Sequence, residues 1–327
     1  MASPWLGTGA GRLTLNEPAP EVKADALDGA ATAFQDSSMR PRLLVTGGSG
    51  FLGSALVRRA APRWETSFTY FRNSPPDLRG VAYRLDLGDE AAVRRVIAAA
   101  RPQVVVHTAM GRGDDEHGEI TARGAGRVAR AAREAGAALI HVSSDMVFDG
   151  EHAPYDESAL PSPVSPYGRA KAAAETGARE AHPDAVLARL PLLYSLDPPD
   201  PRAVQVIRDL EDGRPVTFFT DEMRCPAEVG DVADALLATG ARALDRPAAL
   251  PGTIHLGGPE VLSRWEFGTS LLEALGVPLA GVRAGTLAES GLVRPRDLTM
   301  VSRTTPRELT AGLRPWAAVV AAHRALS

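Results

Sequence analysis

The sequence predicts an α/β protein: a Rossmann-type, doubly wound parallel sheet with a smaller, irregular C-terminal lobe that we expect to bind substrate. Between residues 42 and 193, short runs rich in Val, Ile and Leu alternate with longer amphipathic stretches. Strands that are apolar on both faces are typical of a parallel sheet covered by helices. A glycine-rich segment also stands where the first apolar run meets the first amphipathic stretch. Together these features favour a dinucleotide-binding architecture.

The elements of the sheet region follow in order along the chain. We predict strands at 42–46, 66–71, 81–87, 103–109, 138–144 and 185–193, and helices from about Phe51 and over 90–100, 122–136 and 165–181. The segment 111–119 is unusually acidic, and we expect a solvated loop there rather than a cation site.

Beyond Pro191 the alternation becomes irregular. We predict a linker at 197–201, helices at 202–212, 228–244 and 263–277, a strand at 214–219, and a late strand at 252–258 that returns to the main sheet. The expected division is a cofactor-binding domain of residues 39–190 and 225–258, and a substrate-binding lobe of residues 191–224 and 259–327. Residues 1–38 lack periodicity, and we expect a mobile tail or an extra upstream segment, with Met39 as a candidate natural start.

Composition narrows the function classes. A formal net charge of −4 gives no reason to expect binding to nucleic acid or to a membrane. Cys225 is the only cysteine, which excludes an intramolecular disulfide or a cysteine metal cluster. The seven histidines show no paired spacing typical of zinc, so we expect no metal. With no apolar run of about 18–20 residues and no signal-peptide layout, we expect a cytoplasmic protein.

The glycine-rich segment, LLVTGGSGFLG, places Gly47, Gly50 and Gly53 between the first strand and the first helix. Glycines there permit a tight turn and a close approach of the backbone to a pyrophosphate on the helix N-terminus. A glycine turn without a ligand is the alternative, but the buried strand before it and the apolar helix after it fit the dinucleotide motif. We expect the cofactor to border these glycines and also Ser49, Phe51 and Leu52.

The end of the second strand indicates which dinucleotide binds. A site that prefers NAD usually has an acid here for the adenosine ribose, whereas this chain reads Arg72, Asn73 and Ser74. An arginine fork can hold a 2′-phosphate, so we expect NADP(H), with NAD(H) as the second choice. A solvated loop arginine is the alternative for Arg72. Asp86 and Leu87, which close the third strand, are expected beside the adenine ring.

Lysine is rare in this chain: of 36 lysines and arginines, only Lys23 and Lys171 are lysines. Lys171 stands four residues after Tyr167, so a helix would present both side chains on one face. A tyrosine can protonate an alkoxide formed by hydride transfer, provided that a nearby cation lowers its pKa. A compact ammonium suits that position better than the broad fork of arginine. We therefore predict Tyr167 as general acid and Lys171 as its partner and a ribose contact; an incidental surface lysine is the alternative.

Two serines end the strand before this helix. Ser143 and Ser144 fall at its C-terminal tip, where ligands bind in open α/β sheets. Ser144 is expected to donate a hydrogen bond to the substrate carbonyl, with Ser143 as the alternative.

Taken together, these residues resemble the extended short-chain dehydrogenase/reductase superfamily, and most closely its dTDP-4-dehydrorhamnose reductase branch. The most specific match is SSDMVFDGEHAPYDESALPSPVSPYGRAK, and RPRD at 294–297 resembles a late element of the same branch. The resemblance runs from about Arg42 to the C-terminal region. It implies catalytic roles for Ser144, Tyr167 and Lys171. It also places Thr108, Ala109 and Leu190 beside the cofactor.

The chain departs from that branch at two positions that bear on the site. Met146 stands where the branch has a tyrosine facing the substrate, and Thr121 stands where relatives have asparagine. We therefore expect an altered sugar contact and an altered supporting contact. The substrate residues that the resemblance and the arginine pattern suggest are Ser144, Asp145, Met146, Phe148, Arg224 and Arg294, with Arg264 and Arg296 as further cations for a diphosphate.

The resemblance implies an NADP(H)-dependent reductase acting on a keto group, C4 in the simplest case, of a nucleotide-activated sugar or related polyol. Dehydration is disfavoured because Asp145 is followed by Met146 and not by a second acid. An epimerase stays open. So does a regulatory role, since the branch resembles the regulatory β subunit of methionine adenosyltransferase. The expected partner is a small-molecule substrate, and the sequence leaves a homodimer open.

Overall fold

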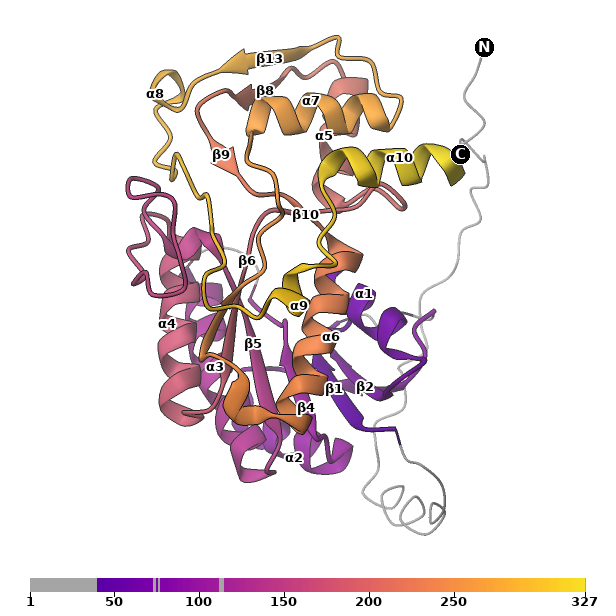
Figure 1. Cartoon of the computed structure of the whole chain (residues 1–327), viewed down its shortest axis with the longest axis vertical. Coiled ribbons are helices and arrows are strands. Elements are labelled where there is room, and N and C mark those ends of the chain that lie inside the picture. The colour runs from indigo at the N-terminus through magenta and orange to yellow at the C-terminus, as the bar shows by residue number, and fades with distance from the viewer. Residues whose placement is uncertain (1–39, 73–74, 76, 112–114, 327) are drawn as a thin grey trace. The chain divides into compact units, whose positions relative to one another are not determined.

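In the described part of the chain, a seven-stranded parallel sheet forms the centre of the fold (Figure 1). The structure is a computed structural model that describes residues 40–72, 75, 77–111 and 115–326; the predictions for residues 1–38, Met39, Asn73 and Ser74 fall outside this part. The strand order is β11-β6-β5-β4-β1-β2-β3. The strands are β1 (Arg42–Thr46), β2 (Glu65–Tyr70), β3 (Val81–Arg84), β4 (Val104–His107), β5 (Ala138–Ser144), β6 (Val186–Leu190) and β11 (Thr253–His255).

All neighbouring strands of this sheet run parallel, which confirms the predicted Rossmann-type class. The chain starts at β1, moves outward to β3, and then crosses to β4 on the other side of β1. Ligands of such sheets bind at this reversal, outside the carboxyl ends of the strands. The late strand β11 pairs with β6, as predicted for the returning segment.

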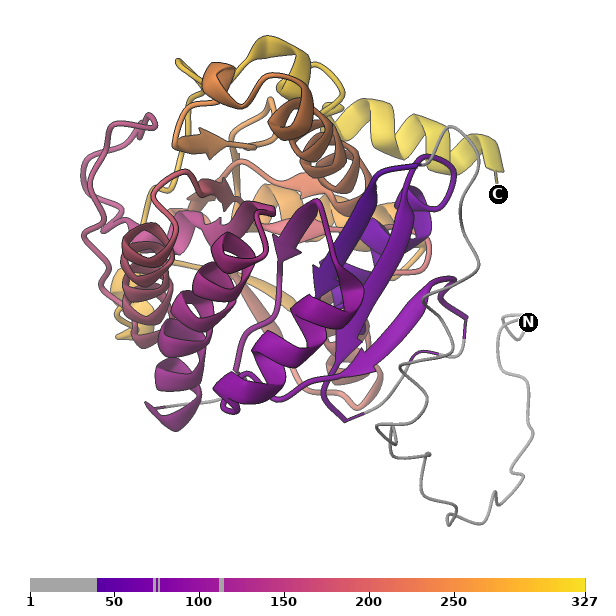
Figure 2. The same cartoon turned by 90° about the horizontal axis from the view of Figure 1, so that it is seen from below.

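Alternate residues of each strand face two helical layers. On β1, Leu43 and Val45 pack with α1 (Phe51–Ala60) and α6 (Val229–Asp245). Leu44 packs on the opposite face with α2 (Glu90–Ala100), α3 (Asp115–Glu134) and α4 (Pro166–Ala181). Figure 2 shows α2, α3 and α4 side by side, and neighbouring helices in this layer are in contact. Burial on both faces explains the continuous apolar runs in the sequence.

Several predicted boundaries differ from the structure, and three of the differences have a clear physical cause. Helix α3 begins at Asp115, so residues 115–119 are helical and not a loop, and Glu119 pairs with Arg123 one turn later. Strand β3 ends at Arg84 because Asp86 forms a turn in which its carboxylate accepts the N–H of Gly88. The predicted strand 185–193 divides into β6 and β7 (Leu193–Tyr194) around Pro191, which has no N–H to pair.

The remaining elements complete the described chain, and some of them share a hydrophobic core of their own that includes Tyr194, Phe267 and Leu271. They are α5 (Pro201–Glu211), β8 (Val216–Phe219), β9 (Met223–Arg224), β10 (Ala227–Glu228), β12 (Leu262–Ser263), α7 (Arg264–Ala274), β13 (Val282–Gly285), α8 (Leu287–Ser290), α9 (Arg307–Thr310), α10 (Trp316–Leu326) and the 3₁₀ turns η2 (Asp145–Val147) and η3 (Pro247–Ala249). Most of them gather above the sheet in Figure 1. The boundary between a cofactor domain and a substrate lobe stays a prediction.

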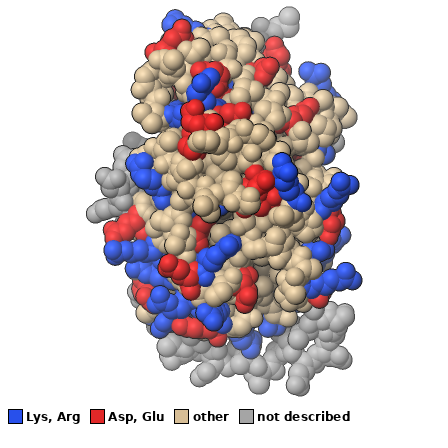
Figure 3. Space-filling view, turned by 60° about the vertical axis from the view of Figure 1, so that its left-hand side comes forward, with Lys and Arg blue, Asp and Glu red and all other residues tan. Residues whose placement is uncertain are grey.

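No helix in the described ranges is long and apolar enough to cross a membrane. On the face drawn in Figure 3, the acidic and basic side chains of the described residues are interspersed, without a broad patch of one sign.

Candidate active site

The glycine turn between β1 and α1 is shaped by close backbone contacts. Gly47 has a φ of +73°, and a Cβ there would lie 2.8 Å from the backbone of Ala109. A Cβ on Gly53 would lie 2.1 Å from the Gly47 carbonyl oxygen. Gly50 caps α1 without a side-chain hydrogen bond, which leaves the N–H groups of the first helical turn for another acceptor. Such a turn fits the pyrophosphate of a dinucleotide.

The other predicted cofactor residues lie around the carboxyl ends of β1 to β4 and β6. Thr108 donates a hydrogen bond to the Thr46 carbonyl, which fixes it beside the glycine turn. Arg72 is exposed just beyond β2, with its guanidinium carbon 5.8 Å from the centroid of the Phe71 ring. The remaining predicted positions differ in exposure: Ser49 and Asp86 are exposed, Phe51 is partly buried, and Leu52, Leu87 and Leu190 are buried.

Helix α4 carries both predicted catalytic side chains of the Tyr-Lys pair. Its N-cap is Ser165, whose hydroxyl accepts the N–H of Gly168 at 3.0 Å, and Pro166 follows in the first turn. Lys171 is only 3% exposed, and its Nζ donates to the Val142 carbonyl of β5 at 2.7 Å. Tyr167 is 39% exposed at the start of the helix. The helix thus places the buried Lys171 ammonium and the partly exposed Tyr167 side chain one turn apart, near the end of β5.

Gly168 allows the first turn of α4 to press onto η2. A Cβ at this position would lie 2.1 Å from the Met146 carbonyl oxygen. The glycine that follows Tyr167 is therefore required by packing, and the packing brings Tyr167 beside Ser144 and Asp145. Both residues act on the phenol: Ser144 lowers the pKa of Tyr167 by hydrogen bonding and Asp145 raises it by its charge.

One electrostatic prediction was wrong. Burial is the largest effect on Tyr167 and raises the pKa of its phenol, which is opposite to the predicted direction. The Lys171 Nζ is directed to the Val142 carbonyl. Burial also lowers the pKa of Lys171 to about 8, and the carboxylate of Glu175 opposes that shift.

Ser144 and Asp145 form a buried polar pair at the end of β5. The Ser144 hydroxyl donates to Asp145 Oδ1 at 2.9 Å and accepts the Met146 N–H at 3.2 Å. Asp145 is 3% exposed, and burial raises the pKa of its carboxyl. Asp145 Oδ2 and Ser143 Oγ are buried and have no hydrogen-bond partner within the described ranges. Ser144 must therefore turn from Asp145 before it can donate to a substrate.

Phe148 does not fit its predicted role beside the substrate. Its ring is fully buried, stacks on Tyr155 at 4.1 Å, and has the guanidinium of Arg189 over it at 5.0 Å. No ring surface is left for a ligand, so Phe148 belongs to the core. Met146 is partly buried next to this core. Thr121 makes a supporting contact of its own, since its hydroxyl accepts the N–H of Gly111 at 2.9 Å.

An arginine cluster lies among the C-terminal elements. The buried Glu222 holds Arg224 and Arg294 through one oxygen, at 2.7 and 2.9 Å. Arg264 is half-buried beside them, and burial lowers the pKa of its guanidinium to about 10. The positive charge of Arg202 also lowers the pKa of Arg264.

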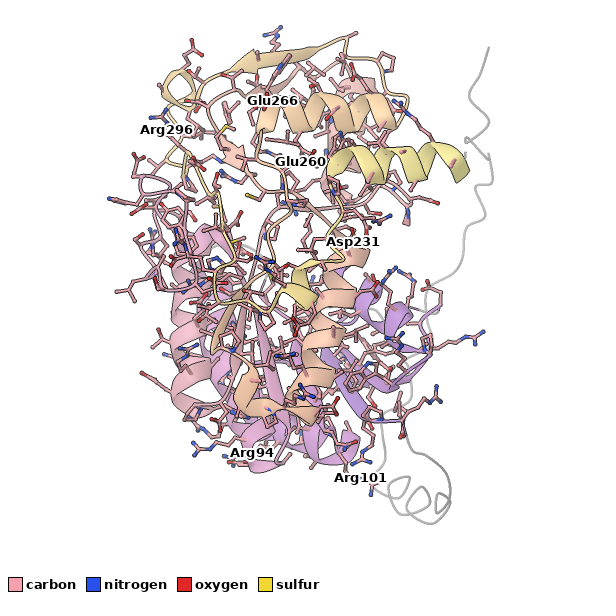
Figure 4. The ribbon with its side chains drawn as sticks, in the orientation of Figure 1. Arg94, Arg101, Asp231, Glu260, Glu266 and Arg296 are labelled. Atoms are coloured by element: carbon pink, nitrogen blue, oxygen red, sulfur yellow. The ribbon has the colours of Figure 1, made fainter. Side chains whose placement is uncertain are left out.

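Of the four predicted diphosphate cations, the structure thus brings Arg224, Arg264 and Arg294 together. Figure 4 shows Arg296 at the outer edge in that view, and its side chain is exposed. Arg202 and Glu222 were missed, since scattered arginines and a lone acid carry no pattern in the sequence.

A pocket with about 390 Å³ of empty volume, part of it open to solvent, adjoins this cluster. Its lining combines the cations Arg202 and Arg264 and the acid Asp200 with apolar side chains that include Phe218 and Phe267. Among the described residues, no group of three or more His, Cys, Asp or Glu side chains is placed to hold a metal ion.

The model of one protein family, described as the RmlD substrate binding domain, matches residues 40–325. The chain belongs to this family. The match confirms the resemblance to the dTDP-4-dehydrorhamnose reductase branch of the extended short-chain dehydrogenases/reductases.

Two curated relatives of this RmlD family protein differ in kind. Methionine adenosyltransferase 2 subunit beta of Mus musculus is 30% identical over 268 residues, covering 78% of this chain and 79% of the relative. The probable low-salt glycan biosynthesis reductase Agl14 of Haloferax volcanii is 26% identical, covering 75% of this chain and 84% of the relative.

Solved structures share the fold. A hypothetical dTDP-4-dehydrorhamnose reductase from Sulfolobus tokodaii is 27% identical with a TM-score of 0.66, covering 79% of this chain and 91% of its own. The dTDP-4-dehydrorhamnose reductase of Bacillus anthracis, solved in complex with NADP, is 21% identical with a TM-score of 0.69, covering 89% of this chain and 100% of its own. At that identity the second likeness shows the fold alone.

Proposed function

We propose that this protein is an NADP(H)-dependent reductase that acts on a keto group, C4 in the simplest case, of a nucleotide-activated sugar or related polyol. One observation carries the proposal: α4 presents Tyr167 and the buried Lys171 at the end of β5, next to Ser144. The Sulfolobus tokodaii structure and the Haloferax volcanii relative, both named as reductases, support the same class.

The cofactor side of the proposal depends on the glycine turn and on Arg72. Gly47, Gly50 and Gly53 would hold the pyrophosphate on the first turn of α1, and Arg72 would take the 2′-phosphate. NADPH, when bound there, supplies the hydride. NAD(H) is the second choice.

Tyr167 supplies the proton. Reduction turns the carbonyl oxygen into an alkoxide, and the phenol O–H gives its proton to that oxygen. The phenol is protonated near neutral pH, which is the form that reduction requires, and the raised pKa of Tyr167 favours that form further. Ser144, once it turns from Asp145, donates a second hydrogen bond to the same oxygen. Lys171 places a positive charge one turn from the phenolate that is left behind.

The arginine cluster would bind the diphosphate of the substrate. Arg202 and Arg264 line the pocket, and no side-chain hydrogen bond of either guanidinium is found within the described residues. Glu222 holds Arg224 and Arg294 in place through one carboxylate oxygen. Arginine forks match phosphate oxygens, which favours a nucleoside diphosphate over a neutral polyol.

Consumption of NADPH with a panel of nucleotide-linked 4-keto sugars tests the proposal. We expect turnover with at least one of them, and we expect Arg264→Ala to raise KM for that sugar more than it lowers kcat. An epimerase would convert the sugar without net NADPH consumption. Tight NADPH binding with no ketone reduced would overturn the reductase.

A second candidate is an NADP(H)-binding regulatory subunit. The relatives named methionine adenosyltransferase 2 subunit beta favour it, with 30% identity over most of both chains. The test is to mix the purified protein with a methionine adenosyltransferase catalytic subunit and to measure complex formation and activity. A complex with altered kinetics, together with no reductase turnover, would favour this candidate.

A further inference from the structure

A buried ion pair joins the helix that carries Tyr167 and Lys171 to the central sheet. Glu175 of α4 and Arg189 of β6 are each 4% exposed and joined by two hydrogen bonds, at 3.0 and 2.9 Å. Arg189 also donates to the Ala159 carbonyl at 2.9 Å and lies over the Phe148 ring. The pair therefore joins α4 to the sheet and to the segment that leads from β5 to α4.

Glu175 is one helical turn beyond Lys171, as Lys171 is one turn beyond Tyr167. Successive positions four apart on a helix share a face. Lys171 and Glu175 are both buried, so their charges act on each other with little solvent screening.

The other titratable groups around Lys171 come from the sheet and from η2. His107 of β4 and His141 of β5 are buried, and burial together with the charge of Lys171 lowers the pKa of both rings, so both stay neutral. Asp145 of η2 acts on Tyr167, and Arg189 is engaged by Glu175. Glu175 is thus the carboxylate that supports the charge of Lys171.

We propose that Glu175 and Arg189 are positioning residues that set what fraction of Lys171 carries a positive charge. This inference rests on the proposed function, because that charge matters through Tyr167. The two partners act on Lys171 in opposite directions. The Glu175 carboxylate favours the charged form of Lys171, and the Arg189 guanidinium weakens this effect because it neutralises part of the carboxylate charge. Neither touches the reacting atoms, so both act through Lys171.

Stability alone does not account for such a pair. A buried ion pair can often be replaced by apolar residues with little loss of stability, because burying two charges costs about as much as their attraction returns. What distinguishes this pair is its place, one turn from Lys171 and across from the end of β5.

The small number of lysines allows a direct test on the full chain. In protein labelled with ¹³Cε-lysine, Lys23 and Lys171 give two signals, and Lys171→Met assigns them. Titration then gives the midpoint of Lys171 without any need for turnover. We expect Glu175→Gln to lower that midpoint by about one pH unit. Arg189→Met should raise it, because the remaining carboxylate then has Lys171 as its cation. Arg189→Lys keeps the charge and should leave the Lys171 midpoint near that of the wild type; the third lysine signal that it adds is assigned by combining it with Lys171→Met.

A purely structural pair would behave differently. Both Glu175→Gln and Arg189→Met would then reduce thermal stability and leave the Lys171 midpoint unchanged, or move it in one direction. Either result overturns the proposal. Asp231→Asn is the matched control, since Asp231 is also buried and paired, with Arg314, but lies on α6 (Figure 4). It should leave the midpoint in place.

Circular dichroism reports whether each variant is folded. If Arg189→Met does not fold, the proposal is still decided by the Lys171 midpoint of Glu175→Gln. That midpoint is compared with the midpoints of the wild type and of Arg189→Lys. A wild-type protein that reduces no ketone would overturn the proposed function, while the lysine titration would still decide this inference. In an active protein, the pH profile of kcat/KM should move with the Lys171 midpoint.

Discussion

At the scale of single residues, the Ser144 hydroxyl has one proton, and the structure directs it to Asp145. To donate this proton to a substrate carbonyl oxygen, the Ser144 hydroxyl must rotate away from Asp145. Ser143, the neighbouring hydroxyl, is buried without a partner in the described structure. The two side chains are chemically identical, so their different roles depend on where each hydroxyl lies.

The serine pair gives the first prediction. Ser144→Ala should lower kcat/KM by roughly 10²-fold, because one donor to the developing oxyanion is lost. Ser143→Ala is the matched control and should change kcat/KM by less than about 3-fold, since its hydroxyl has no hydrogen-bond partner among the described residues. The measurement is steady-state NADPH consumption with the best 4-keto sugar. Equal losses in the two variants would contradict the assignment.

Arg72 gives the second prediction. Arg72→Ala should weaken NADPH binding by about 10-fold, the loss expected for one charge-assisted contact, and leave NADH binding nearly unchanged. Fluorescence titration of the two reduced cofactors measures both affinities. If both decline by the same factor, Arg72 does not select the 2′-phosphate.

How far the site could be predicted depends on the range of the interaction. The spacing of Tyr167 and Lys171 fixes their common helix face locally, and the structure has both on α4. The burial of Phe148 depends on Tyr155 and Arg189, which sequence spacing does not connect. The acceptor of the Lys171 ammonium is a backbone carbonyl, which has no sequence signal, and the raised pKa of Tyr167 depends on burial in the folded chain.

At the scale of elements, the contact between α4 and η2 positions the site. The contact depends on Gly168, where the Met146 carbonyl leaves no room for a Cβ. The sequence motif around Tyr167 therefore includes a packing requirement as well as chemistry. Boundaries such as the start of α3 could not be predicted from charge alone, because an acidic run can form a helical turn once Glu119 finds Arg123.

Gly168→Ala gives the third prediction. The added methyl must push the first turn of α4 off η2, so we expect a lower melting temperature and a loss of turnover of about 100-fold or more, as small misplacements of reacting groups cost that much. Gly177→Ala, on the same helix, is the control, because its nearest neighbour would lie at an ordinary 3.6 Å. Thermal melts and kcat compare the two. Similar losses of melting temperature and kcat in the two variants would contradict the proposed packing role of Gly168.

At the scale of the whole described unit, Glu157 joins the segment after β5 to the C-terminal part of the chain. Its carboxylate accepts the N–H groups of Arg303, Thr304 and Thr305. Burial opposes ionisation of Glu157, but the hydrogen bond from the Thr305 hydroxyl and those from backbone N–H groups lower its pKa to about 2. The parallel sheet itself was predictable from the alternation of strands and helices. This long-range contact was not, and neither was the pairing of two-residue strands, since neither has a periodic signal.

Glu157→Gln gives the fourth prediction. A folded-state pKa below the ordinary 4.5 means that ionised Glu157 adds stability above pH 4.5 and loses it as the pH falls toward 2. At neutral pH the variant should be less stable by about 2 kcal/mol, because charged acceptors are lost. The gap between wild type and variant in denaturant melts should narrow as the pH falls below 4.5. A gap that stays constant down to pH 3 would contradict this role.

The most direct test of the central claim is a single-turnover reduction by Tyr167→Phe and wild type, with NADPH prebound and a reducible 4-keto nucleotide sugar added. We predict that the variant binds NADPH with nearly unchanged affinity but loses at least about 10³-fold in the rate of hydride transfer, because no group replaces the phenolic proton. A variant that oxidises NADPH at close to the wild-type rate would contradict the account.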